Sequence, residues 1–170
     1  MNWCRRLCLG LTLSLAALSG CLSKEAPVPS TPAKQRILIL CTGNSCRSQL
    51  AEALWRHEAG DRYDVQSAGT APKGVHPLTL KVLDEIGVST AGLRSKHVDE
   101  INTSQLDFMV TVCDNAKENC PVLIGSFRRE HWPFDDPAAA KGSGEEVLPV
   151  FRRVRDQIRE RIRQHLASQK

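Results

Sequence analysis

The sequence predicts a single-domain α/β fold, in which a four-stranded parallel sheet is flanked by helices. Two observations support this prediction. Short apolar runs of strand length alternate along the chain with longer segments whose apolar residues recur every three or four positions. Glycines also stand directly after several of these longer segments, where helices commonly end. Strands that alternate with helices pair in parallel, because each helix carries the chain back to the start of the next strand.

The first half of the domain alternates strand and helix. Residues 36–40 are apolar and suit a buried strand, and residues 63–67 suit a second strand. A helix over residues 45–59 lies between them and stops at Gly60. Its apolar face comprises Leu50, Ala51, Leu54 and Trp55. A second helix, over residues 77–86, has an apolar face of Leu78, Val82, Leu83 and Ile86.

The second half has shorter strands and one long helix. We expect a helical turn over residues 98–101, a third strand over 108–112 and a fourth strand near 131–134. The closing helix covers residues 145–167, and its apolar stripe comprises Val147, Phe151, Val154, Ile158, Ile162 and Leu166. In parallel sheets, ligands bind at the carboxyl ends of the strands. The candidate residues that follow predicted strands, and should therefore meet at one edge, are Cys41, Cys113 and Asp136.

The N-terminal 35 residues have the pattern of a targeting segment and a tether. Residues 1–6 are basic and residues 7–18 are apolar, which suits the core of a signal peptide and is too short to span a membrane. The Leu-Ser-Gly-Cys sequence that ends at Cys21 resembles a bacterial lipoprotein signal, which implies that Cys21 is acylated. Residues 22–35 contain three prolines and no periodicity, as expected of a tether. The globular domain then covers residues 36–170.

This targeting pattern predicts a lipoprotein anchored to a membrane on the periplasmic or another extracytoplasmic side. Two alternatives remain open: a secretory signal without a lipid, or a misassigned start codon and a cytoplasmic protein. The net charge of +4 and the 5% of aromatic residues offer neither a strongly basic surface nor stacking platforms, so the composition argues against nucleic acid binding. Nothing in the sequence indicates an oligomer, and we expect a monomer.

The most informative segment is Cys41-Thr42-Gly43-Asn44-Ser45-Cys46-Arg47, followed by Ser48. It lies between the first predicted strand and the first predicted helix. Such a loop directs successive backbone N–H groups into one concavity at the positive end of the helix dipole, which suits a tetrahedral oxyanion. We therefore expect residues 42–48 to bind an oxyanion.

Individual residues give this loop its chemistry. The positive field favours a thiolate at Cys41, a nucleophile that faces the bound oxyanion. Arg47 offers a planar fork that matches an oxyanion. Ser48 can donate a hydrogen bond to the thiolate. Gly43 and Asn44 tolerate the positive φ that such a loop needs.

Two more cysteines, Cys113 and Cys120, flank a polar segment after the third predicted strand. With Cys41 and Cys46 they allow three disulfide pairings. Four interpretations stay open: a zinc site, a structural disulfide, inert buried thiols, or a redox relay coupled to Cys41. Zinc sites usually show C-x-x-C or H-x-x-x-H spacing, which is missing here, so we expect no metal and no cofactor. We favour the relay, in which Cys46 has no task beyond shaping the loop.

Three motifs in order resemble a known family. The C-x5-R loop, with its trailing Ser48, is similar to that of the low-molecular-weight tyrosine phosphatase superfamily. Together with the Cys113 to Cys120 segment and the sequence EHWPFDDP at residues 130–137, it resembles the thioredoxin-coupled arsenate reductases of that superfamily. The resemblance runs from about residue 36 to the C-terminus. It implies a low-molecular-weight phosphatase fold, arsenate as the substrate and a thioredoxin-like dithiol as the reductant.

The resemblance also implies catalytic roles. Cys41 attacks arsenic, and Asp136 protonates the departing oxygen, with Asp135 as an alternative acid. Cys113 then attacks Cys41 and releases arsenic(III). Cys120 attacks Cys113 and leaves a Cys113–Cys120 redox disulfide for the reductant.

Two other functions are compatible with the sequence. A low-molecular-weight protein-tyrosine phosphatase would use the same loop and acid on a phosphate ester, through a phospho-cysteine. Against it, residues 138–140 are alanines where tyrosine phosphatases of this family carry aromatic residues, and Cys113 and Cys120 would have no task. We still expect residual phosphatase activity. The other alternative is an exported oxyanion-binding protein whose cysteines are permanently oxidised.

One position departs from the family pattern. Some members of the reductase family bind potassium with an acidic residue in the segment of residues 93–97, and Lys96 occupies that position here. A lysine ammonium group can replace the ion. We therefore expect no potassium requirement.

Overall fold

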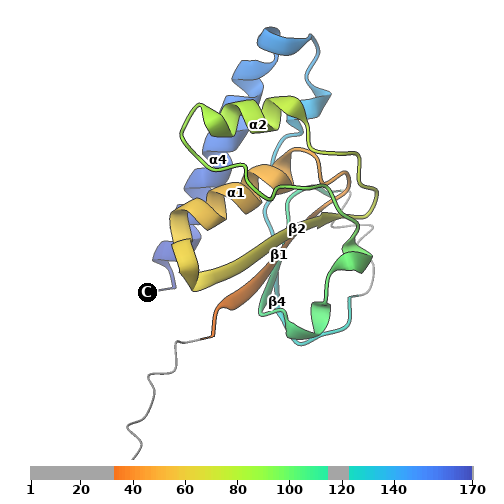
Figure 1. Cartoon of the computed structure of the whole chain (residues 1–170), viewed down its shortest axis with the longest axis vertical. Helices are drawn as coiled ribbons and strands as arrows, with labels where there is room; N and C mark the ends of the chain where they lie inside the picture. The colour runs from red at the N-terminus through yellow and green to blue at the C-terminus, as the bar shows by residue number, and fades with distance from the viewer. Residues whose placement is uncertain (1–32, 115–122, 170) are drawn as a thin grey trace, which may run out of the picture. The chain divides into compact units, whose positions relative to one another are not determined.

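A four-stranded parallel sheet lies at the centre of the structure, with the strand order β2-β1-β3-β4 (Figure 1). The computed structural model describes residues 33–114 and 123–169. The strands are β1 (Gln35–Cys41), β2 (Tyr63–Gly69), β3 (Phe108–Thr111) and β4 (Arg128–His131). The predicted sheet is thus confirmed, and Cys41 ends one of its two interior strands.

Three helices lie on one side of this sheet (Figure 1). They are α1 (Arg47–Ala59), α2 (Pro77–Asp84) and α4 (Leu148–Ala167). Because side chains alternate along a strand, Ile37 and Ile39 of β1 pack with these helices, whereas Leu38 and Leu40 face the other way. The second face is covered by Val98 of the 3-10 turn Val98–Glu100 and by Ile101, Leu106, Leu123 and Phe127.

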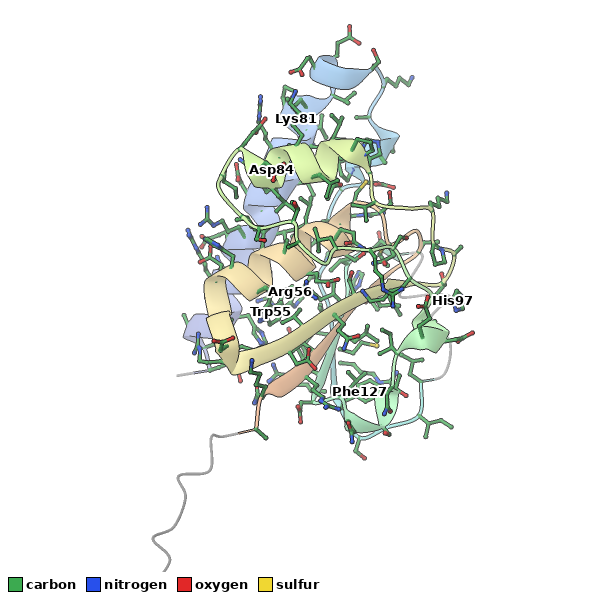
Figure 2. All side chains as sticks on the ribbon, viewed as in Figure 1. Trp55, Arg56, Lys81, Asp84, His97 and Phe127 are labelled. Carbon is green, nitrogen blue, oxygen red and sulfur yellow. The ribbon has the colours of Figure 1, made fainter. Side chains whose placement is uncertain are left out.

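Trp55 of α1 stands at the centre of an aromatic cluster on the helix side. Its ring stacks on Trp132 with centroids 5.4 Å apart and meets His165 of α4 at 5.2 Å. Figure 2 labels Trp55 on the helix side and Phe127 on the opposite side of the sheet. The cluster joins α1 and α4 to the chain that follows β4, so the positions of both helices are fixed relative to the sheet.

Two predicted boundaries are wrong in the parts of the chain nearest Cys41. The fourth strand covers Arg128–His131 rather than 131–134, because Pro133 has no N–H to add to the sheet. The first helix begins at Arg47, two residues later than predicted. Cys46 before it has φ −119° and ψ −83°, which is not helical, so this residue still belongs to the loop.

The closing helix also begins later than predicted, at Leu148 instead of Glu145. A 3-10 turn, Gly144–Glu146, precedes it, with Gly144 at φ 48°. Pro149 stands in the first turn of the helix, where its missing N–H costs no hydrogen bond. The proline therefore marks the start of this helix more closely than the apolar pattern does.

Several predicted features lie outside the described residues: the signal segment with Cys21, the tether as far as Pro32, and Cys120. β1 begins at Gln35, the last residue of the expected tether. In the described part of the chain, no helix has the length and apolar character needed to cross a membrane.

Candidate active site

The loop between β1 and α1 runs beside the segment of residues 70–76, which follows β2. Its carbonyl oxygens all accept hydrogen bonds from outside the loop. The donors to the carbonyls of residues 41 to 45 are, in order, Thr70 N, Ala71 N, Lys73 N, Gln49 Nε2 and His76 N, at 2.9 to 3.3 Å. Because the carbonyls point outward, the concave side is left to N–H groups, which is the geometry of an anion site.

Cys41 is held at this concavity by two hydrogen bonds. Asn44 N donates to Cys41 Sγ at 3.0 Å, and Ser48 Oγ lies 2.9 Å from the same sulfur. Asn44 Nδ2 donates to Ser48 Oγ at 2.9 Å, which leaves the hydroxyl proton of Ser48 free to donate to sulfur. The predicted contact between Ser48 and Cys41 is therefore present, and the serine can donate to a thiolate.

The side chain of Asn44 is fixed by the strands and loops around it. Its Oδ1 accepts from Lys96 N at 2.8 Å, so the amide orientation is determined, and its Nδ2 also donates to Ser67 Oγ at 2.8 Å. Asn44 is fully buried, with φ 43°. The predicted positive φ at this residue is confirmed.

A buried ion pair lies behind Asn44. Glu52 of α1 accepts hydrogen bonds from the N–H (2.8 Å) and the hydroxyl of Ser67, pairs with Arg56, and lies 3.6 Å from Lys96 Nζ. Burial lowers the pKa of Lys96, and the charge of Glu52 opposes that change. The ammonium of Lys96 thus supplies a cation to this buried carboxylate, although potassium independence stays a prediction.

Two residues that support the loop, Glu52 and Ser67, were not predicted from the sequence. One signal was available for Glu52, which stands four residues after Ser48 and next to Ala51 on the apolar face of the first helix. An acid in that position needs a buried partner. For Ser67 there was no such signal, because it falls inside an ordinary strand pattern.

The ionisation of Cys41 is subject to opposing influences. Burial raises the pKa of its thiol, and the nearby Cys113 adds to the rise. The hydrogen bonds from Ser48 and Asn44 N–H lower the pKa. Burial therefore opposes the thiolate that is expected from the loop alone, and the hydrogen bonds from Ser48 and Asn44 favour it.

A pocket of about 490 Å³ opens in front of Cys41. Its lining comprises Cys41, Thr42, Gly43, Ser45, Cys46, Arg47, Lys73, His76, Asp136 and Ala138. Six residues of the predicted loop and the predicted acid thus meet at one site, while Asn44 and Ser48 lie buried beneath it. Lys73 and His76 come from the 70–76 segment, and no pattern in the sequence pointed to them.

Asp136 and Arg47 contact each other in this pocket. Arg47 Nη2 lies 3.1 Å from Asp136 Oδ2, and Arg47 Nη1 donates to the carbonyl of Phe134 at 3.0 Å. Asp135 instead points to the surface, where it lies 3.3 Å from Arg153. Between the two candidate acids, the geometry favours Asp136.

Cys113 lies at the same edge of the sheet, just after β3. Its sulfur is 3.6 Å from Thr42 Oγ1, and only 2% of the residue is exposed. Cys41, Cys46 and Cys113 are all free thiols. The predicted pairing of Cys113 with Cys120 falls outside the described residues.

The expectation for Gly43 is wrong. Its φ is not positive, and a Cβ at this position would make only ordinary contacts, 3.6 Å and more, with the Lys73 side chain. The close approach occurs instead at Gly69, where a Cβ would lie 2.5 Å from Thr42 O and 2.9 Å from Asn44 N. The glycine that this loop needs therefore belongs to β2, the neighbouring strand.

Within residues 33–114 and 123–169, no three His, Cys, Asp or Glu side chains form a group that could hold a metal ion. The candidate reacting groups are a thiol, a guanidinium and a carboxyl group around an anion site.

Comparison with known families agrees with this geometry. Residues 36–170 match the family described as low molecular weight phosphotyrosine protein phosphatase. The chain belongs to this family. An arsenate reductase of Shouchella clausii is 45% identical over 132 residues, which cover 76% of the chain and 94% of the relative. An arsenate reductase of Bacillus subtilis is 41% identical over 75% of the chain and 92% of the relative.

Solved structures of the family show the same fold. The crystal structure of an arsenate reductase from Archaeoglobus fulgidus has a TM-score of 0.64 at 30% identity, over 77% of this chain and 98% of that one. A thioredoxin-dependent arsenate reductase from Corynebacterium glutamicum has a TM-score of 0.61 at 28% identity, over 83% of this chain and 63% of that one. The predicted low-molecular-weight phosphatase fold is confirmed.

Proposed function

We propose that this family member reduces arsenate to arsenite through a relay of three cysteines. The observation that carries the proposal is the position of Cys113, a buried free thiol beside the Cys41 loop. A phosphatase cycle gives this thiol no task, whereas a reductase needs a second sulfur close to the nucleophile. The arsenate reductases among the relatives support the same choice.

The first step is attack on the oxyanion. Arsenate occupies the concave side of the loop, where N–H groups and Arg47 hold its oxygens. The Cys41 thiolate attacks arsenic and forms a sulfur–arsenic(V) bond. Asp136 donates a proton to the departing oxygen, which leaves as water.

The second step moves two electrons to arsenic. The Cys113 thiolate attacks Cys41 Sγ and forms a disulfide. The sulfur–arsenic bond breaks, its electron pair stays on arsenic, and arsenic(III) leaves as arsenite. Cys120 then attacks Cys113 and frees Cys41, and an external thioredoxin-like dithiol reduces the Cys113–Cys120 disulfide.

The location of the enzyme is part of the proposal. An acyl group on Cys21 would anchor the chain to a membrane, with residues 22–34 as the link to β1. β1 begins at Gln35 and ends at Cys41, so the pocket lies at the far end of the strand, about 20 Å from where the tether joins. β1 therefore enters the sheet at the end opposite the pocket.

A phosphatase is the second candidate, because Cys41, Arg47 and Asp136 alone suffice for ester cleavage. The pocket mouth presents the methyl group of Ala138 where an aromatic residue would contact a tyrosine ring. We expect weak hydrolysis of aryl phosphates. That activity provides a second readout for the same site.

The decisive experiment compares both activities in the pre-reduced full-length protein. Arsenate, thioredoxin, thioredoxin reductase and NADPH are supplied, and arsenite is measured together with NADPH consumption. Cys113→Ser and Cys120→Ser should lose sustained arsenite formation but keep aryl phosphate hydrolysis, which controls for folding. Cys41→Ser should lose both activities. Full turnover in Cys120→Ser, or hydrolysis without arsenite in the wild type, would contradict the relay.

A further inference from the structure

The pocket in front of Cys41 has to accommodate several negative charges at once. The proposed chemistry places a divalent oxyanion next to a thiolate, with the carboxyl group of Asp136 in the same lining. Arg47 is the cation that the loop motif provides. Its guanidinium already contacts Asp136 at 3.1 Å, so its charge is shared between the acid and the substrate. A second cation in the pocket would offset the remaining negative charge of the oxyanion and the thiolate.

Lys73 is in the right place to be that cation. Its backbone N donates to Gly43 O at 2.9 Å, which ties the residue to the loop. A Cβ on Gly43 would lie 3.6 Å from Lys73 Cδ and 3.7 Å from its Cγ, so the alkyl chain of Lys73 crosses the loop at Gly43. Lys73 is also part of the pocket lining, from the side of the 70–76 segment.

The charge of Lys73 is not used elsewhere in the described structure. Lys34, Lys81 and Lys96 each pair with an acid, at Asp61, Glu145 and Glu52 respectively. Within residues 33–114 and 123–169, no acidic side chain lies within ion-pair distance of Lys73. A lysine that is tied to an anion site and lacks an acidic partner there is available for an anionic ligand.

We propose that Lys73 is an oxyanion-binding residue, which shares the charge of a divalent tetrahedral substrate with Arg47. This inference rests on the proposed oxyanion site but does not require that arsenate be reduced. The alkyl chain of Lys73 lies beside Gly43, at a distance that leaves room for ordinary contact. The 70–76 segment thus both orients the loop carbonyls and contributes a charge to the pocket.

Sulfate is a suitable probe, because it is a tetrahedral dianion that the cysteines cannot reduce under these conditions. The pre-reduced full-length protein is treated with neutral iodoacetamide at constant ionic strength, and alkylation of Cys41 is followed by peptide mass spectrometry. The measured quantity is the sulfate concentration that halves the alkylation rate. For each variant, the alkylation rate with sulfate is divided by the rate of the same variant without sulfate. A change in the reactivity of the thiol therefore does not affect the measured sulfate concentration.

In Lys73→Met this concentration should rise about fivefold, the effect of losing one partly exposed charge contact. Lys73→Arg keeps the charge and should stay within about twofold of the wild type. Lys34→Met is the matched control, since it removes a lysine charge at the opposite end of β1, and it should leave the value unchanged. Added salt should weaken sulfate protection more in the wild type than in Lys73→Met.

The outcomes separate the two proposals. Protection by sulfate that is equal in the wild type and Lys73→Met overturns the role of Lys73 and leaves the reductase untouched. Protection that depends on Lys73, in a protein that forms no arsenite, supports the binding role and contradicts the reductase. No protection in the wild type at any sulfate concentration would overturn the oxyanion site and the role of Lys73 together.

Discussion

Asn44 connects the nucleophile to the rest of the molecule through both its backbone and its side chain. Its N–H donates to Cys41, and its amide group contacts Ser48, Ser67 and the backbone of Lys96. Ser48 Oγ, which accepts from Asn44 Nδ2, also lies 2.9 Å from the sulfur of Cys41 and can donate to it. The loop is therefore set for an anionic sulfur before any substrate binds.

Ser48→Ala should make Cys41 less reactive near neutral pH. The hydroxyl lowers the pKa of the thiol, so its removal should raise that pKa and move the alkylation curve to higher pH. The rate of iodoacetamide alkylation of Cys41, measured from pH 5 to 10, tests this. Ser104→Ala removes an exposed hydroxyl elsewhere and should give the wild-type curve. A Ser48→Ala curve that coincides with the wild type would mean that the thiolate does not need this bond.

At the same scale, the sequence predicted the residues of the loop but not those that support it. Cys41, Arg47 and Ser48 form one motif, and their spacing alone placed them around an anion. Lys96 and Ser67 contact Asn44 from 52 and 23 residues away. Such long-range contacts depend on how β2 and the following loop pack. They cannot be predicted from a local sequence pattern.

Among the elements, β2 and the segment after it shape the loop more than α1 does. Four N–H groups of residues 70–76 hold the loop carbonyls. His97, which is labelled in Figure 2, has its Nε2 3.0 Å from the carbonyl of Thr70 at the start of the segment. The close approach of Gly69 to Thr42 lets β2 pair with β1 as far as Cys41. The sequence predicted both strands but ended the second at Ser67, because Ala68 and Gly69 are weak strand formers.

Gly69→Ala should therefore be far more damaging than Gly43→Ala. The added methyl group would meet backbone atoms of Thr42 and Asn44 at 2.5 and 2.9 Å, so the loop or the strand must move. We expect a loss of about 2–3 kcal/mol in the free energy of unfolding for Gly69→Ala, as for other overpacked sites. Gly43→Ala should cost less than about 1 kcal/mol. Urea unfolding of both variants measures the difference, and equal losses would contradict this account.

In the molecule as a whole, the cysteines at the reactive edge of the sheet and the aromatic cluster belong to one hydrophobic core. The cluster centres on Trp55, Trp132 and Phe108, and His165 of α4 packs within it, 5.0 Å from Phe108. Arginines of α4 tie the same helix to acids on other elements, as Arg159 and Arg163 do with Glu58 of α1. The fold is thus stabilised in part by aromatic and ion-pair contacts whose side chains do not line the pocket.

His165 should make that stability fall in weak acid. Burial lowers its pKa in the folded protein; Glu130 opposes the shift, and the positive charges of Arg128 and Arg161 add to it. The unfolded chain binds the proton at about pH 6.5, so its imidazole gains a proton that the folded state resists. The contribution is therefore fully present above that pH and is lost as the pH falls from there through the lower pKa of the folded state.

His165→Phe keeps an aromatic ring in the cluster but removes the titrating group. The urea midpoint of the wild type should be lower at pH 5.5 than at pH 7.5. In the variant, the midpoint should change less between these two pH values. The remaining histidines are common to both proteins. Any difference between the two proteins in how the urea midpoint changes with pH is therefore due to His165. An equal change of the midpoint in both proteins would contradict this account. It would mean that the folded protein protonates His165 without loss of stability, with a positive charge beside Trp55.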